Sequence, residues 1–144
     1  MVKMPHWPKP IERSAKDFTL SRVRSLLNKL GDPQKSMPPI IHIAGTNGKG
    51  STLSFLKSIF VQAGYKVHAY TSPHITRFNE RITISNNEIS DEILYKTTEQ
   101  VRQKSGDAEI TFFEATTAIA FLNFAQNQAD ICLCLLYTSP SPRD

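Results

Sequence analysis

The sequence predicts an α/β fold in which a mostly parallel sheet is flanked by helices. Short apolar runs rich in β-branched residues alternate along the chain with longer segments of helical periodicity. A glycine-rich turn joins the first of these runs to the helix that follows it. The length of 144 residues suits one domain of ordinary size. Strands that alternate with helices form units whose strands lie parallel, which predicts this class.

Helices are expected where apolar residues recur at a period of 3.6. The first begins near Leu20 and ends at Gly31, because Pro33 prevents its continuation. Ser90 is expected to cap a later helix, since two acidic residues follow it, and Gly106 to end that helix. The predicted helices after the first are residues 51–63, 90–105 and 112–126.

Strands are expected in short runs of β-branched and other apolar residues. Residues 40–44 and 130–133 are predicted to be buried strands. Residues 66–70 predict another strand, and the alternating residues 81–85 predict a strand that turns at Asn86-Asn87. Residues 71–80 show no period and contain a proline, so we expect a loop there.

Composition excludes several classes of protein. The 17 basic residues exceed the 13 acidic ones by only 4 and are scattered, which does not favour nucleic acid as a partner. The two cysteines, Cys132 and Cys134, form neither a disulfide framework nor a zinc pattern. The proline-containing start is not a signal peptide, and no apolar stretch is long enough to span a membrane. We therefore expect a cytoplasmic protein.

The strongest functional signal is the glycine-rich segment, here called the phosphate loop. It comprises Gly45, Thr46, Asn47, Gly48, Lys49, Gly50, Ser51 and Thr52. Glycines let backbone N–H groups converge on an anion, and the next helix presents its positive end to the same anion. Lys49 supplies a mobile charge for the outer phosphates. The general P-loop spacing is not met, because Gly50 separates Lys49 from Ser51, so a plain glycine turn with a solvated lysine is the alternative.

The phosphate loop with the preceding residues 42–44 resembles the signature of the folylpolyglutamate and dihydrofolate synthases, within the Mur ligase superfamily. Related cell-wall ligases usually place a hydroxyl residue directly after the lysine, so Gly50 favours the folate branch. The resemblance covers about residues 15–133. It implies a P-loop-type sheet with flanking helices, in which the domain formed by residues 18–133 binds ATP.

Three further segments resemble the same family. Residues 71–82 match its loop after the second strand, where the resemblance makes Ser72 a Mg²⁺ ligand and His74 a residue that orients the loop. From the residues alone, an ordinary turn serine is the favoured interpretation of Ser72. Residues 110–114 give Thr111 a contact with the pterin substrate, whereas the following Glu114 is either functional or a helix cap. The third segment, residues 17–22, resembles an N-terminal element that contributes to the family's pteroate pocket. There the resemblance implies that Asp17 and Phe18 line the pocket.

The resemblance implies a reaction. ATP, with Mg²⁺, phosphorylates a carboxylate of dihydropteroate or of a folate, and the amino group of L-glutamate attacks the acyl phosphate to form an amide. Lys49 would neutralise oxygens of the transferred phosphoryl group. A monomer is expected. The alternatives are another ligase of the superfamily, a nucleotide-binding module without catalysis, and a basic nucleic-acid-binding domain.

The two ends of the chain are expected to lie outside the folded domain. Residues 1–17 are rich in proline and predict an N-terminal arm. Residues 134–144 resemble a translated sequencing adapter, with a natural disordered terminus as the alternative. The family implies a glutamate ligand of Mg²⁺ about two residues after Leu133, and a C-terminal glutamate-binding domain. Because neither is present, we expect the 144-residue polypeptide to lack ligase activity.

Overall fold

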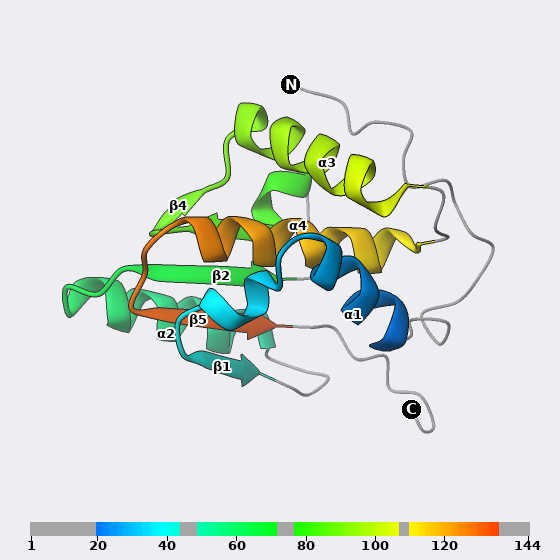
Figure 1. Ribbon diagram of the computed structural model, residues 1–144. Coiled ribbons are helices and arrows are strands. Elements are labelled where there is room, and N and C mark those ends of the chain that lie inside the picture. The colour runs from blue at the N-terminus through cyan, green and yellow to red at the C-terminus, as the bar shows by residue number, and fades with distance from the viewer. Residues whose placement is uncertain (1–19, 44–48, 72–76, 107–109, 136–144) are drawn as a thin grey trace, which may run out of the picture. The chain divides into compact units, whose positions relative to one another are not determined.

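The computed structural model describes residues 20–43, 49–71, 77–106 and 110–135 (Figure 1). The chain divides into two compact units. One comprises Met1–Ser36 and Ser90–Gln126, here called the helical unit, and the other comprises Met37–Ile89 and Asn127–Asp144, here called the sheet unit. No helix in the described ranges has both the length and the apolar character needed to cross a membrane.

The sheet unit contains a five-stranded mixed sheet in the order β1-β5-β2-β3-β4. Its elements are β1 (Ile40–Ile43), α2 (Lys49–Gln62), β2 (Val67–Thr71), a 3-10 turn η3 (Phe78–Arg81), β3 (Ile82–Ile84), β4 (Asn87–Glu88) and β5 (Ile131–Leu135). β5 lies parallel to both β1 and β2, whereas β3 is antiparallel to its neighbours β2 and β4. The predicted α/β class is confirmed, and the parallel arrangement applies to three of these strands.

α2 packs against one face of the sheet, where alternate residues of β2 and β5 form an apolar core. The buried members of this core are Leu53, Val67, Ala69, Leu133 and Leu135. β5 includes Cys134 and Leu135, so the expectation that residues 134–144 all lie outside the folded domain is wrong for these two residues. α2 begins at Lys49 rather than at the expected Ser51. Residues 136–144 lie outside the described part of the chain.

The prediction that β1 is buried is wrong for the described residues. β1 pairs with β5 on one side only, and Ile40 and Ile41 are 50% and 36% exposed. His42 is exposed as well. Hydrophobic, β-branched residues favour an extended strand wherever it lies, but the burial of a strand depends on which elements pack against it. The run of apolar residues therefore predicted the strand correctly and its burial incorrectly.

The β3–β4 hairpin turns at Ser85 and Asn86, one residue earlier than predicted. Both residues have positive φ, 47° and 77°, and Ile84 pairs with Asn87, as in a two-residue type I′ turn. The side-chain oxygen of Asn86 also accepts a hydrogen bond from the backbone N–H of Val67 at 2.7 Å. Asn tolerates positive φ better than most residues, which explains its place in the turn.

His68 is a fully buried side chain that holds two loops of the sheet unit. Its Nδ1 accepts a hydrogen bond from Ser85 N–H at 3.0 Å, so Nε2 carries the proton that is donated to Asn127 O at 3.0 Å. Replacing His68 with leucine is expected to lower the free energy of unfolding by about 2 kcal/mol, because both hydrogen bonds are lost. Urea denaturation measures this, with the exposed His42→Leu as control; equal losses in both variants would contradict the assigned role.

Cys132 and Cys134 are free and buried, and they lie on the same face of β5 because they are two residues apart. Burial raises the pKa of Cys132 from 9.0 to about 12, with a further contribution from Cys134, and burial raises that of Cys134 to about 11. Both thiols stay protonated in the folded chain well above the pH at which they ionise in the unfolded chain.

This pKa difference predicts a loss of stability in alkali. Below about pH 9 the thiols are protonated in both the folded and the unfolded chain. They therefore contribute no pH dependence to the free energy of unfolding in that range. As the pH rises from about 9 towards 11, the unfolded chain loses protons first, so the free energy of unfolding falls. We also expect native protein to resist iodoacetamide at pH 8, as followed by mass spectrometry, and urea-unfolded protein to react. Equally rapid labelling of both states would contradict this prediction.

The helical unit contains α1 (Leu20–Lys29), a 3-10 turn η2 (Pro33–Ser36), α3 (Asp91–Ser105) and α4 (Phe112–Gln126). These three helices pack against one another. Between α3 and α4, the buried Asn123 donates a hydrogen bond to Thr97 Oγ1 at 3.2 Å. Ser90 caps α3 as predicted, accepting from Ile93 N–H at 3.2 Å, and Gly106 ends it with a φ of 59°.

Candidate functional site

The strand and helix expected on either side of the phosphate loop are both present. β1 ends at Ile43 and α2 begins at Lys49, and residues 44–48 between them lie outside the described ranges. Lys49, Gly50 and Ser51 form the first turn of α2, which contains no acidic residue. The first N–H groups of a helix have no partner within it, and the helix dipole makes this end positive. The end of α2 that follows the loop is therefore suited to an anion.

The carboxyl ends of the three parallel strands are in register. Ile43 of β1 and Thr71 of β2 both lie opposite Leu135 of β5. The chain therefore leaves β1 and β2 at the same edge of the sheet, at points about 10 Å apart, two strand spacings. Ligands of open α/β sheets bind at this edge. The phosphate loop follows β1 there, and Ser72, which is outside the described residues, comes directly after Thr71.

The described residues 78–81, later in the same segment, form structural contacts. The buried Asn79 in η3 donates from its amide to Ile89 O at 2.9 Å. The guanidinium of the buried Arg81 lies 5.3 Å from the centroid of the Phe78 ring. Burial lowers the pKa of Arg81 from its ordinary value, an effect that the nearby Tyr70 opposes. These contacts explain several of the residues that resemble the family's loop, and sequence reasoning did not assign them.

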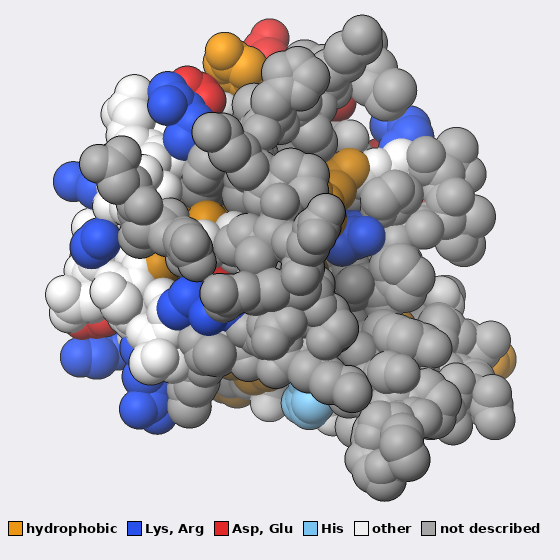
Figure 2. Space-filling model, turned by 90° about the vertical axis from the view of Figure 1, so that its right-hand side faces the viewer, with side chains coloured by type: hydrophobic (Ala, Val, Ile, Leu, Met, Phe, Trp, Pro, Cys, Tyr) orange, Lys and Arg blue, Asp and Glu red, His pale blue; other side chains and the backbone are white. Residues whose placement is uncertain are grey.

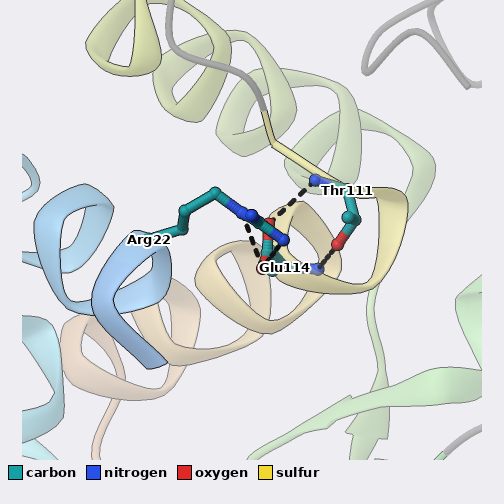
Figure 3. Close-up of polar contacts among 3 residues, drawn as sticks. All are labelled: Arg22, Thr111 and Glu114. Atoms are coloured by element: carbon teal, nitrogen blue, oxygen red, sulfur yellow. Dashed lines mark hydrogen bonds and ion pairs between the residues drawn. The ribbon is translucent and has the colours of Figure 1, made fainter. Parts of the chain in front are cut away.

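Thr111 caps α4. Its hydroxyl oxygen accepts a hydrogen bond from Glu114 N–H at 3.1 Å, and its own N–H donates to Glu114 Oε1 at 2.9 Å (Figure 3). This reciprocal pair is a capping box, in which the two residues satisfy N–H groups at the start of the helix. Of the two roles open for Glu114, the structure therefore shows the capping one.

Glu114 also forms an ion pair that the sequence did not predict. Its carboxylate is fully buried and faces the guanidinium of Arg22 in α1, which is 23% exposed (Figure 3). Arg22 Nε lies 3.0 and 3.1 Å from the two carboxylate oxygens, and its Nη2 lies 2.9 Å from Oε2. The partners are 92 residues apart in the chain, and no local pattern signals such a pair. Leaving one partner of a buried pair alone is strongly destabilising.

Some of the predicted site residues lie inside the described ranges of the structure and others lie outside them. Those outside the described ranges are Asp17, Phe18, Gly45, Thr46, Asn47, Gly48 and Ser72. The backbone of α2 includes Lys49, Gly50 and Ser51. Thr52, also in α2, is exposed. In the described ranges no three His, Cys, Asp or Glu side chains are grouped as a metal site would require. The assignment of ATP to the phosphate loop and of Mg²⁺ to Ser72 stays a prediction from the sequence.

Figure 2 shows Lys and Arg side chains at several separate places among the described residues that it colours. This distribution agrees with the scattered basic residues of the sequence.

Comparison with known proteins gives a consistent result. The dihydrofolate synthase/folylpolyglutamate synthase of Bacillus subtilis is 42% identical over 113 residues, which are 74% of this chain and 26% of that protein. The protein of the same name from Escherichia coli is 37% identical over 117 residues, 81% of this chain and 28% of its own length. The chain is homologous to the folylpolyglutamate and dihydrofolate synthases. It spans just over a quarter of these relatives, and no family model matches it.

Solved structures of these synthases share the fold. Escherichia coli FolC in complex with DHPP and ADP superposes with a TM-score of 0.81 at 33% identity, covering 90% of this chain and 31% of that one. A bifunctional folylpolyglutamate synthase/dihydrofolate synthase with Mn, AMPPNP and L-glutamate bound superposes with a TM-score of 0.76 at 35% identity, covering 83% of this chain and 29% of that one. The resemblance to this family and the α/β fold that it implied are thereby confirmed.

Proposed function

We propose that this chain provides the nucleotide-binding part of an ATP-dependent ligase that joins L-glutamate to dihydropteroate, to a folate, or to both. The observation that carries the proposal is the edge of the sheet where β1, β5 and β2 end in register, because the glycine-rich residues follow β1 and precede α2 in the sequence. Homology to folylpolyglutamate and dihydrofolate synthases, two of which were solved with ADP or AMPPNP, supports it.

Each part of the phosphate loop has a role in this proposal. Backbone N–H groups of residues 47–51 hold the β-phosphate of ATP at the positive end of α2. Lys49 places its ammonium against the oxygens of the γ-phosphoryl group and offsets the charge that they carry during transfer. Ser72 offers a hydroxyl oxygen to Mg²⁺, which prefers oxygen ligands. An ion held there would supply positive charge that offsets the charge of the phosphates during transfer.

The substrate residues complete the reaction. Thr111, together with Asp17 and Phe18, binds the pterin-bearing substrate, so that a carboxylate oxygen attacks the γ-phosphorus and ADP leaves. The amino nitrogen of L-glutamate then attacks the acyl carbon, and phosphate departs as the amide forms. Positioning and charge neutralisation supply most of the catalysis in such transfers. We propose that the enzyme acts as a monomer in the cytoplasm.

A hybrid enzyme tests this function, because the chain spans only about a quarter of its relatives. Residues 15–133 would replace the matching segment of the Bacillus subtilis relative. We expect ADP release that requires both L-glutamate and dihydropteroate or a folate, with the amide product identified by mass spectrometry. ADP release with another amino acid or acceptor would indicate a different ligase of the superfamily. Nucleotide binding without turnover would indicate a module without catalysis.

A further inference from the structure

We propose that Arg22 is a positioning residue for substrate binding, which acts by holding Glu114 and, through it, the hydroxyl of Thr111. The inference rests on the proposed function, in which Thr111 contacts the pterin-bearing substrate. Arg22 itself need not touch any ligand in this arrangement. All three residues belong to the helical unit, Arg22 in α1 and the other two at the start of α4.

The carboxylate of Glu114 is the centre of the arrangement. Oε1 accepts hydrogen bonds from Thr111 N–H at 2.9 Å and from Arg22 Nε at 3.0 Å. Oε2 lies 3.1 Å from Nε and 2.9 Å from Nη2 of the same arginine. Because a guanidinium is a rigid planar fork, contacts to both oxygens set the orientation of the carboxylate as well as its distance. A fully buried carboxylate held in this way has little freedom to turn.

The orientation of Glu114 determines that of Thr111. The backbone N–H of Thr111 donates to the carboxylate, and its hydroxyl oxygen accepts from Glu114 N–H at 3.1 Å. A hydroxyl has one proton to donate and two lone pairs to accept with. With one lone pair used by the helix, the hydroxyl keeps its proton for a donor bond to the substrate. Thr111 is only partly buried, so part of the residue is accessible to a ligand.

A second arginine in the helical unit provides a matched control. Arg102 in α3 donates from Nε and Nη2 to both oxygens of Glu99, at 3.0 and 2.8 Å, in the same forked geometry. This pair is exposed, with the arginine side chain at 44%, and both residues belong to one helix. Arg102→Met therefore removes an equal charge and a similar forked contact to a carboxylate without affecting Glu114.

The test measures binding of two ligands to the full 144-residue chain by calorimetry. Arg22→Met is expected to weaken dihydropteroate binding by about tenfold, the equivalent of one misplaced hydrogen bond, with Mg·ADP binding unchanged within about twofold. Arg22→Lys keeps the charge and is expected to restore part of the affinity. It also replaces Arg22→Met if circular dichroism shows that the methionine variant does not fold.

A double-variant cycle separates positioning from general stability. In a Thr111→Val background, Arg22→Met is expected to cause no further loss of dihydropteroate affinity, because the group that it positions is already absent. An equal loss in both backgrounds would overturn the inference, as would equal losses for both ligands or an Arg22→Met chain that behaves like Arg102→Met. If the wild-type chain binds Mg·ADP but not dihydropteroate, the substrate role of Thr111 fails and the inference fails with it, whereas the nucleotide site stands.

Discussion

Replacing Lys49 with alanine is expected to lower glutamate ligation by the hybrid enzyme by about 100-fold or more. Lys49 is the first residue of α2, directly after the loop that leaves β1, so its charge belongs at the phosphate-binding end of the helix. Without Lys49, the transferred phosphoryl group would have no ammonium beside it to offset its negative charge in the transition state. A backbone N–H, which carries no full charge, does not replace it. Binding of Mg·ADP to the 144-residue chain should weaken less, because the N–H groups of the loop and helix remain.

Lys57→Ala is the control, since it removes the same charge from the same helix. Lys57 lies eight residues further along, about 12 Å along the helix axis, and its Nζ donates to Thr83 Oγ1 at 3.3 Å. Steady-state ADP release measures both variants. If Lys57→Ala slowed ligation as much as Lys49→Ala, the effect would come from general charge rather than from the phosphate site.

Replacing Leu133 with alanine is expected to lower the free energy of unfolding by about 3 kcal/mol. Leu133 is fully buried in β5, the strand between β1 and β2, and it belongs to the core that α2 covers. Removing its branched end leaves a cavity among neighbours on three elements, and these neighbours cannot all move to fill it.

Urea denaturation followed by circular dichroism measures this change. Ile59→Ala on α2 is the control, because it removes a similar apolar volume from a side chain that is 58% exposed. We expect that control to stay within about 0.5 kcal/mol of the wild type. A loss for Leu133→Ala no larger than that of Ile59→Ala would contradict the assignment of β5 to the centre of the core.

Local features of the sequence were enough to place most elements. α4 was predicted at residues 112–126, where it lies, and the glycines expected to end α1 and α3 do so with positive φ. The Ser90 cap and the strand before the phosphate loop were predicted as well. All of these features depend on helix caps, periodicity or backbone preference, which involve residues within about one helical turn of each other. Such local patterns can be recognised in a single sequence.

The sequence by itself also determined the family resemblance, because the phosphate loop is a continuous motif. Only the tertiary structure decided the strand order, the exposure of β1 and the antiparallel pairing of β3 with β2. It alone paired Arg22 with Glu114, across 92 residues. These features depend on which distant segments come together, and the free energy of such contacts comes from packing and burial that no local pattern encodes.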